Sequence, residues 1–243
     1  MIGMNRPNKG LERHCSTHRE ENVLHCSWGS MNWLVHRILQ RHLARVAREH
    51  ARGRLLDVGC GEKPYRALFA PFVTEHIGLD HGDTQHARDA IDLYGYADAI
   101  PAEAMSFDTI LATAVLEHVE EPVRSVAEMH RVLRPGGIVI LTAPLFWHVH
   151  EAPRDFYRFT SYGLRYLFEK AGFTISELTP LSGFVVTFAQ ELVYFVHGTL
   201  PRWLNPVVGR ALGTLIQATA YLLAPLDRST HFTWMYLVVA RKP

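Results

Sequence analysis

The stretch LLDVGCGEKPY, residues 55–65, puts an acidic residue at the end of an apolar run and follows it with two glycines one residue apart. An apolar run that stops in this way is typical of a short buried strand, and the glycines after it let a ligand lie against bare backbone. A dinucleotide pyrophosphate would call for G-x-G-x-x-G, yet the third glycine position is Pro64. The stretch therefore predicts a ligand-binding turn after a strand at residues 54–58, and it disfavours a pyrophosphate ligand.

Strand and helix signals alternate on both sides of this turn. A helix is predicted at residues 33–47, before the first strand. The predicted strands are residues 54–58, 76–79, 90–96, 107–112, 138–141, 173–178 and 232–240, and the later helices are residues 62–69, 122–133 and 160–172. This order predicts an α/β fold with a mostly parallel seven-stranded sheet, helices on both faces and a ligand crevice at the carboxyl ends of the strands.

The composition bears on the number of domains, the class of partner and the cellular compartment. The 243 residues are 48% apolar and 20% charged, so we expect one domain at residues 31–243 after a loose tail at residues 1–30. A formal net charge of +1 gives no basic field for phosphate backbones, and nucleic acid is not expected as a partner. Cys15, Cys26 and Cys60 lack paired spacing, and the N-terminus lacks the apolar core of a secretory signal; both features favour the cytoplasm.

The tail gathers residue types that bind metals. These residues are His14, Cys15, His18, His25 and Cys26. Their spacing matches no zinc finger or ribbon, and their polar neighbours offer nothing to fix the ligands. We expect a mobile or locally packed tail without a metal ion, and the sequence leaves open whether the cluster binds one.

Five segments resemble the class I S-adenosylmethionine-dependent methyltransferases, in the same order. LLDVGCG is similar to that family's first motif, HIGLD to its second strand with the ribose-binding acid, and ADAIP to its adenine-binding segment. FDTILATAVLEHV and VLRPGGIVILTAP resemble its fourth and fifth strand regions. The resemblance covers about residues 55–144 and implies a Rossmann-like fold, S-adenosylmethionine as cofactor and S-adenosylhomocysteine as product.

The resemblance also implies cofactor-binding roles along one edge of the sheet. The residues concerned are Asp57, Gly59, Cys60, Gly61, Asp80, Asp98, Ala99 and Thr113. Gly59 and Gly61 would face the amino acid part of the cofactor, and Asp80 would accept both ribose hydroxyls as an ionised carboxylate. Asp98 would meet the adenine amine, Ala99 the ring through its backbone, and Thr113 the methionine moiety. Asp57 is expected to orient the turn or hold a cationic group, and Cys60 to pack rather than act as a nucleophile.

A carboxylate and an imidazole, Glu117 and His118, follow the fourth predicted strand. Some relatives place another Glu three residues before such a pair and bind a divalent ion there, but that position is Ala114 here. We therefore expect no metal, and expect the pair to orient the neighbouring loop through hydrogen bonds.

The segment LFWHVHEAPRDFYRFTSYG, residues 145–163, follows the fifth strand, where an open α/β sheet places its second ligand. We call it the acceptor segment. Its candidate catalytic residues are His148, His150 and Tyr157, and its candidate substrate-binding residues are Trp147, Asp155, Phe156 and Arg158. A histidine suits a general base near neutral pH. The alternatives stay open that the histidines bind the loop backbone and that Asp155 pairs with Arg158.

An apolar insert, residues 181–226, separates the last two strands. Its periodicity predicts two amphipathic helices, with Phe188, Leu192 and Leu215 among the apolar stripes and Gln190 and Gln217 on the opposite sides. Glu191 and Arg210 near mid-helix argue against a membrane span. We expect a hairpin packed over the substrate side of the sheet, and a homodimer contact or a peripheral membrane contact remains open.

These features together predict methyl transfer from S-adenosylmethionine to a small aromatic or lipophilic acceptor, at oxygen, nitrogen or carbon. The alternative from another class is a non-catalytic protein that binds the cofactor and serves as a partner or regulator. A nicotinamide oxidoreductase ranks third because the third glycine is absent from the turn.

Overall fold

The computed structural model describes residues 16–17, 24–25, 28–83 and 88–243. In the tail, β1 (Ser16–Thr17) pairs antiparallel with β2 (Leu24–His25). His14, Cys15, His18 and Cys26 lie outside the described residues, so the expectation that the tail holds no metal stays a prediction.

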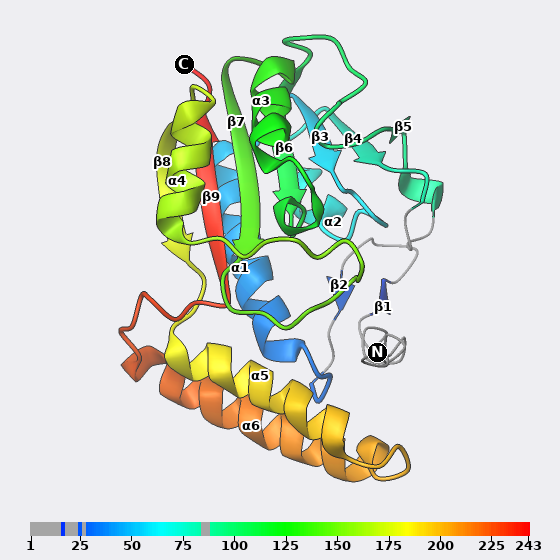
Figure 1. Cartoon of the computed structure of the whole chain (residues 1–243), viewed down its shortest axis with the longest axis vertical. Helices are drawn as coiled ribbons and strands as arrows, with labels where there is room; N and C mark the ends of the chain where they lie inside the picture. Colours follow the sequence, from blue (N-terminus) through cyan, green and yellow to red (C-terminus); the bar gives the residue numbers. More distant parts are fainter. Residues whose placement is uncertain (1–15, 18–23, 26–27, 84–87) are drawn as a thin grey trace, which may run out of the picture.

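Seven strands form one sheet, in the order β5-β4-β3-β6-β7-β9-β8 (Figure 1). The strands are β3 (Arg54–Val58), β4 (Glu75–Asp80), β5 (Leu93–Tyr94), β6 (Phe107–Thr113), β7 (Leu133–Pro144), β8 (Thr174–Pro180) and β9 (Met235–Arg241). Neighbouring strands run parallel except that β9 is antiparallel to both β7 and β8. The predicted Rossmann-like, mostly parallel sheet is confirmed, and the strand order reverses at β3, where the glycine turn lies.

Helices cover both faces of the sheet (Figure 1). The helical elements are α1 (Trp33–His50), α2 (Arg66–Phe69), η1 (Arg88–Ala90), η2 (Leu116–His118), α3 (Pro122–Val132), α4 (Ser161–Lys170), α5 (Phe184–Thr199), η3 (Asn205–Gly209), α6 (Arg210–Leu223) and η4 (Ala224–Leu226). Alternate strand residues separate two cores: Leu56 packs with residues of α3 and α4, and Leu55 packs with residues of α1 and α2. Both sides of the central strands are therefore buried, as parallel sheets require.

The strand predicted at residues 90–96 is reduced to Leu93–Tyr94, and Ala90 belongs to the short helix Arg88–Ala90 before it. Two further predicted elements differ from the structure for local reasons. The helix predicted at residues 62–69 shortens to Arg66–Phe69, since Lys63 has a left-handed φ of 51° and Pro64 follows it. The strand predicted at residues 138–141 extends back to Leu133, because Phe107 pairs with Leu133 and the ladder continues through the turn-like RPGG sequence. The sequence placed both elements correctly and missed only their ends.

The insert is a helical hairpin, α5 and α6, which lies beyond the carboxyl end of β7 (Figure 1). Two buried glutamines attach it to the start of α1. Gln190 donates to the carbonyl of Met31 at 3.0 Å, and Gln217 donates to the carbonyl of Ser30 at 2.9 Å and accepts from the N–H of Leu34 at 2.9 Å.

The expectation that the apolar stripes of the hairpin pack inward is wrong. Phe188 and Leu192 of α5 and Leu215 of α6 are exposed, while Gln190 and Gln217 of the predicted polar sides are buried. The main chain accounts for both ends of the Gln217 amide, and it accepts from the Nε2 of Gln190, whose Oε1 has no hydrogen-bond partner among the described residues. The hairpin therefore presents apolar side chains outward.

Candidate functional site

The turn after β3 requires glycine. Gly59 and Gly61 have φ angles of 66° and 48°, in the left-handed region. A Cβ on Gly59 would lie 2.6 Å from Cγ2 of Val115, which follows β6. The N–H groups of Gly59 and Cys60 donate to the carbonyl of Leu79 in β4, at 2.8 and 3.0 Å. The turn is thus held between the ends of the two strands beside it, with bare backbone along its course.

Asp80 ends β4 beside this turn and is almost fully buried. Its Oδ2 accepts from the N–H of Gly61 at 3.0 Å, and its Oδ1 accepts from the N–H of His81 at 2.8 Å. A carboxylate has about four lone-pair sites, so each oxygen can still accept one more hydrogen bond. The residue therefore fits the ribose-binding role, and the two main-chain bonds fix the direction in which it would accept.

Asp57 does not contact the turn through its side chain. Its Oδ2 lies 2.9 Å from Nε2 of His76, and both side chains are buried. Burial raises the pKa of Asp57, and the hydrogen bond with His76 opposes that effect. Leu79 and Asp80 make the hydrogen bonds to the turn, so the expected role of Asp57 in orienting the turn or holding a cationic group stays a prediction. Asp57 couples β3 to β4.

Cys60 faces the protein interior from the same turn. It is 2% exposed, and burial raises the pKa of its thiol to about 12. A thiol with that pKa carries no thiolate near neutral pH, so Cys60 is unsuited to nucleophilic attack. The packing role expected from the sequence agrees with this environment.

The predicted adenine side holds two rings that the sequence reasoning missed. The ring of His81, which directly follows Asp80, stacks on Tyr96 with 5.8 Å between centroids. Tyr96 forms an isolated bridge with Ala99, which is exposed, and Asp98 lies between them. The guanidinium of Arg154, from the acceptor segment, lies 5.9 Å from the Tyr96 ring centroid. An aromatic directly after the ribose-type acid was the signal that could have identified His81.

Thr113 ends β6 on the same edge, as the sequence predicts. The next residue, Ala114, has a left-handed φ of 55°, and its N–H donates to the carbonyl of Thr142 at 3.1 Å. The chain therefore turns sharply after Thr113, so that η2 follows directly at the edge of the sheet. The eight predicted cofactor residues all lie on or next to the ends of β3, β4 and β6 or on the 96–99 turn.

Asp155 and Arg158 bind each other and fasten the acceptor segment. The Arg158 guanidinium donates to both carboxylate oxygens of Asp155, at 2.6 and 2.8 Å, and also to the carbonyls of Trp147 and His148. Burial raises the pKa of Asp155, but the hydrogen bonds from Arg158 and from the N–H of His150 outweigh it and lower the pKa to about 2. This geometry matches the pairing that the sequence left open as an alternative to substrate binding.

The three candidate catalytic residues differ in their surroundings. The Tyr157 hydroxyl donates to the carbonyl of Glu120 at 3.0 Å, and Nδ1 of His150 lies 3.3 Å from the carbonyl of His148. His148 is exposed, and its Nδ1 lies 3.8 Å from the carboxylate of Glu191 in α5. Of the three, His148 and Tyr157 are exposed, whereas His150 is half-buried.

Main-chain bonds join the acceptor segment to η2. The carbonyl of Glu117 accepts from the N–H groups of Phe156 and Tyr157, at 2.8 and 3.3 Å. Nδ1 of His118 donates to the carbonyl of Arg154 at 2.6 Å. Glu117 and His118 thus orient the segment beside the predicted cofactor edge, although the carboxyl group of Glu117 takes no part in these bonds.

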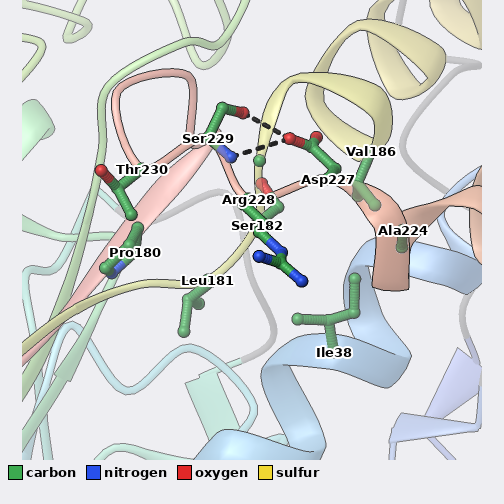
Figure 2. Close-up of a pocket in the computed structure, with 11 residues that line it drawn as sticks. Ile38, Pro180, Leu181, Ser182, Val186, Ala224, Asp227, Arg228, Ser229 and Thr230 are labelled. Carbon is green, nitrogen blue, oxygen red and sulfur yellow. Dashed lines mark hydrogen bonds between the residues drawn. The ribbon is translucent and has the colours of Figure 1, made fainter.

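Two cavities lie at the root of the hairpin. One of about 320 Å³ is bordered by Ile38 of α1, Val186 of α5 and the 227–230 turn, where Ser229 donates to Asp227 (Figure 2). A second, of about 450 Å³, is lined by Phe184, Leu223 and Phe232 among others. Neither of these two cavities includes a predicted cofactor or acceptor residue.

Comparison with known proteins gives the same assignment as the motifs. The methyltransferase domain family matches residues 56–141. A probable S-adenosylmethionine-dependent methyltransferase of Mycolicibacterium smegmatis is 32% identical over 106 residues, which are 41% of this chain and 41% of that protein. A demethylmenaquinone methyltransferase of Staphylococcus haemolyticus is 26% identical over 134 residues, 48% of this chain and 56% of that protein. The chain spans about half the length of these curated relatives.

Solved structures share the fold. A putative methyltransferase from Bacillus halodurans aligns with a TM-score of 0.54 at 19% identity, covering 84% of this chain and 98% of that one. The [4+2]-cyclase SpnF aligns with a TM-score of 0.55 at 24% identity, covering 84% of this chain and 80% of that one. These likenesses concern the fold alone, whereas the family match falls on the segments that carry the motifs. Residues 56–141 therefore carry a methyltransferase domain, and the motifs within them resemble those of the class I S-adenosylmethionine-dependent methyltransferases.

Proposed function

We propose that this protein transfers the methyl group of S-adenosylmethionine to a small aromatic or lipophilic molecule. One observation carries the proposal: the turn held by Asp80 and Leu79 lies on the same sheet edge as η2, whose main chain positions the acceptor segment. A methyl-donor site and an acceptor site must adjoin, because methyl transfer is an in-line displacement that depends on alignment.

The cofactor residues would act mainly by position. Asp80 would accept the two ribose hydroxyls, Gly59 and Gly61 would admit the amino acid part, and Thr113 would border the methionine chain. When bound, S-adenosylmethionine supplies the electrophilic methyl group. The His81–Tyr96 stack lies next to Ala99, where the family resemblance expects the adenine ring, so we infer that these rings border the base.

On the acceptor side, we assign proton removal to His148 and alignment to Trp147, Phe156 and Tyr157. His148 is exposed, and its ring lies 4.2 Å from that of Tyr194. Asp155 and Arg158 would act indirectly, by holding the segment in place. A base is needed only where the acceptor atom carries a proton, so His148 matters for hydroxyl or amine acceptors.

An aromatic cluster supports a lipophilic acceptor. Phe146 of the acceptor segment meets Phe188 of α5 at 5.9 Å and Phe232 at 6.1 Å between centroids, and each of the three is more than a third exposed. Such a surface binds apolar groups through burial of area. The quinone-type name of the Staphylococcus haemolyticus relative, demethylmenaquinone methyltransferase, points to the same substrate class.

We infer further that the outward face of the hairpin rests on an anionic lipid surface. Trp203, Phe195 and Leu215 are 77, 65 and 63% exposed. Within residues 181–231 the charged side chains are Arg202, Arg210 and Arg228 against Glu191 and Asp227, and Asp227 already accepts hydrogen bonds from the N–H of Val185 and from Ser229. Exposed apolar side chains on a segment with more arginines than acids suit a surface helix on anionic lipid.

One helical stretch, Asn205–Leu226, is long and apolar enough to cross a membrane by length and composition. Its side toward the rest of the protein carries the buried Gln217, which is bonded to Ser30 and Leu34. Because those bonds hold α6 against the folded domain, we favour contact with the membrane surface over a span.

The test of function is a labelled-methyl experiment. Cell extract is incubated with S-adenosylmethionine carrying an isotopic methyl group and with either the natural protein or Asp80→Ala, and products are sought by mass spectrometry. The proposal expects a labelled small apolar product that forms only with the natural protein. Calorimetry should show binding of S-adenosylhomocysteine and none of NAD, and the reverse preference would remove the proposal.

A second candidate function is cofactor binding without methyl transfer. It is favoured by the likeness to the [4+2]-cyclase SpnF, because one fold serves several chemistries. The labelled-methyl experiment distinguishes the two candidate functions. Tight binding of S-adenosylhomocysteine without labelled product from any extract would favour the second.

A further inference from the structure

We propose that Glu117, His118 and His150 form a binding site for a divalent transition-metal ion. Glu117 and His118 belong to η2, and His150 comes from the acceptor segment. One ligand atom from each of the three residues lies within 4.8 Å of the others. The site would join the two elements that border the acceptor side, and it includes none of the predicted cofactor residues.

The carboxyl group of Glu117 is the first reason. The residue is 0% exposed, and neither carboxyl oxygen has a hydrogen-bond partner among the described residues. Asp57 and Asp80, the other buried acids near this edge of the sheet, are paired with His76 and with main-chain N–H groups respectively. Burying an acidic group without a hydrogen-bond partner costs free energy. A buried carboxyl group that has no such partner is therefore suited to bind a cation.

The two histidines are the second reason, because main-chain carbonyls fix their tautomers. A carbonyl only accepts hydrogen bonds, so Nδ1 of His118 carries the proton toward Arg154 and Nδ1 of His150 carries it toward His148. Each neutral ring then keeps the lone pair of Nε2 free. Histidines that bind metals are held in the same way, with the other ring nitrogen donating to a carbonyl or carboxylate.

The neighbourhood of the cluster fits coordination. The rings of His118 and His150 lie 4.7 Å apart at 72°, so they approach edge to face rather than stacking. A carboxylate oxygen of Glu151 lies 3.8 Å from Nε2 of His118 and is exposed, which makes it available as a fourth ligand. The site therefore offers two nitrogens and one or two carboxylates, at the boundary between interior and solvent.

This donor set selects the class of ion. Two imidazoles with a carboxylate suit zinc, cobalt, nickel or iron, whereas magnesium and calcium prefer all-oxygen sites. We therefore assign the site to a zinc-class ion. The sequence argued against a metal because Ala114 stands where some relatives have a Glu, but the fold supplies a third ligand, His150, from the acceptor segment.

The direct test is zinc and cobalt binding by the full-length protein after treatment with a chelator. Calorimetry measures the stoichiometry and affinity, and the visible absorption of bound cobalt reports the donor set. We expect one ion per chain. Glu117→Gln, His118→Gln and His150→Gln should each weaken binding by at least roughly 10- to 100-fold, the loss seen when even an outer hydrogen-bonding partner of a metal ligand is removed. His231→Gln, a change at an exposed histidine, should bind as the natural protein does.

The outcomes are distinguishable. Absence of zinc and cobalt binding would overturn the proposal, as would binding that all three variants retain, which would place the ion in the His/Cys tail. Preference for magnesium over zinc would overturn the assigned class. Circular dichroism and S-adenosylhomocysteine binding of each variant show whether it folds. If Glu117→Gln does not fold, His150→Gln decides the matter, because His150 is only half-buried, whereas Glu117 is fully buried.

Discussion

The Oδ2 atom of Asp80 accepts a hydrogen bond from the main-chain N–H of Gly61 at 3.0 Å, and this bond unites the acid that ends β4 with the glycine turn that follows β3. The two residues lie 19 positions apart in the sequence, yet this hydrogen bond fixes the position of each relative to the other. The carboxylate cannot rotate freely, and the left-handed Gly61 is held at the φ that keeps its N–H aimed at the acid.

Asp80→Ala should weaken S-adenosylhomocysteine binding. The change removes two expected hydrogen bonds to an ionised acceptor, together about 2–4 kcal/mol, or roughly 30- to 900-fold in dissociation constant. Calorimetry measures it, with Asp89→Ala as the matched control at an exposed acid of η1. An unchanged constant in Asp80→Ala would move the ribose site elsewhere.

Gly59→Ala should destabilise both the fold and the cofactor site. The added Cβ would meet Val115 Cγ2 at 2.6 Å on a left-handed backbone, which costs about 1–3 kcal/mol or more. Gly82→Ala is the control, because a Cβ there meets no atom within 4 Å. Urea unfolding measures both variants. Equal stabilities for the two would show that the turn adapts to a side chain.

The Asp155–Arg158 ion pair should make the free energy of unfolding depend on pH in the acidic range. The folded pKa of Asp155, about 2, lies below its ordinary value of 3.8, so the contribution is fully present above about pH 4 and is lost as pH falls toward 2. Its size is about 2 kcal/mol, from a shift of nearly two pKa units. Asp155→Asn should remove that part of the acid dependence, as measured by urea unfolding at several pH values. The prediction fails if the natural protein and the variant lose stability in parallel between pH 4 and pH 2.

His148→Ala should lower turnover while S-adenosylhomocysteine affinity stays within a few-fold, because His148 lies on the acceptor side. Labelled product formed per unit time in extract is the measurement. Tyr166→Phe, a change at an exposed residue of α4 outside the acceptor segment, serves as the control. Full product formation by His148→Ala would assign proton removal to another residue, or to none.

The protein should bind through its hairpin to vesicles of phosphatidylcholine mixed with phosphatidylglycerol. It should bind much less to vesicles of phosphatidylcholine alone. Trp203→Ser and Leu215→Ser should reduce co-sedimentation, high salt should reduce it further, and Tyr162→Ser should leave it unchanged. Carbonate-resistant membrane association would instead establish a span. If vesicles do not bind and Leu215→Ser abolishes concentration-dependent self-association, the exposed face is a dimer contact.

The sequence by itself determined the order of strands and helices and the placement of Asp80, Thr113 and the glycine turn. These depend on local patterns: apolar runs that form strands, and glycines that permit left-handed φ angles. Since parallel strands align their carboxyl ends, residues at the ends of separate runs were bound to share one edge. The acceptor segment was identified for the same reason, by its position after β7.

Only the tertiary structure decided which partners the polar side chains found. Periodicity located the two faces of each hairpin helix, but the main chain at residues 30–34 forms hydrogen bonds with Gln190 and Gln217, and these bonds turn the apolar faces outward. In the same way, η2 and the acceptor segment bring His150 to Glu117 and His118. Such contacts join residues far apart in the chain, and their energies depend on burial and on available donors and acceptors, which no local pattern of residues specifies.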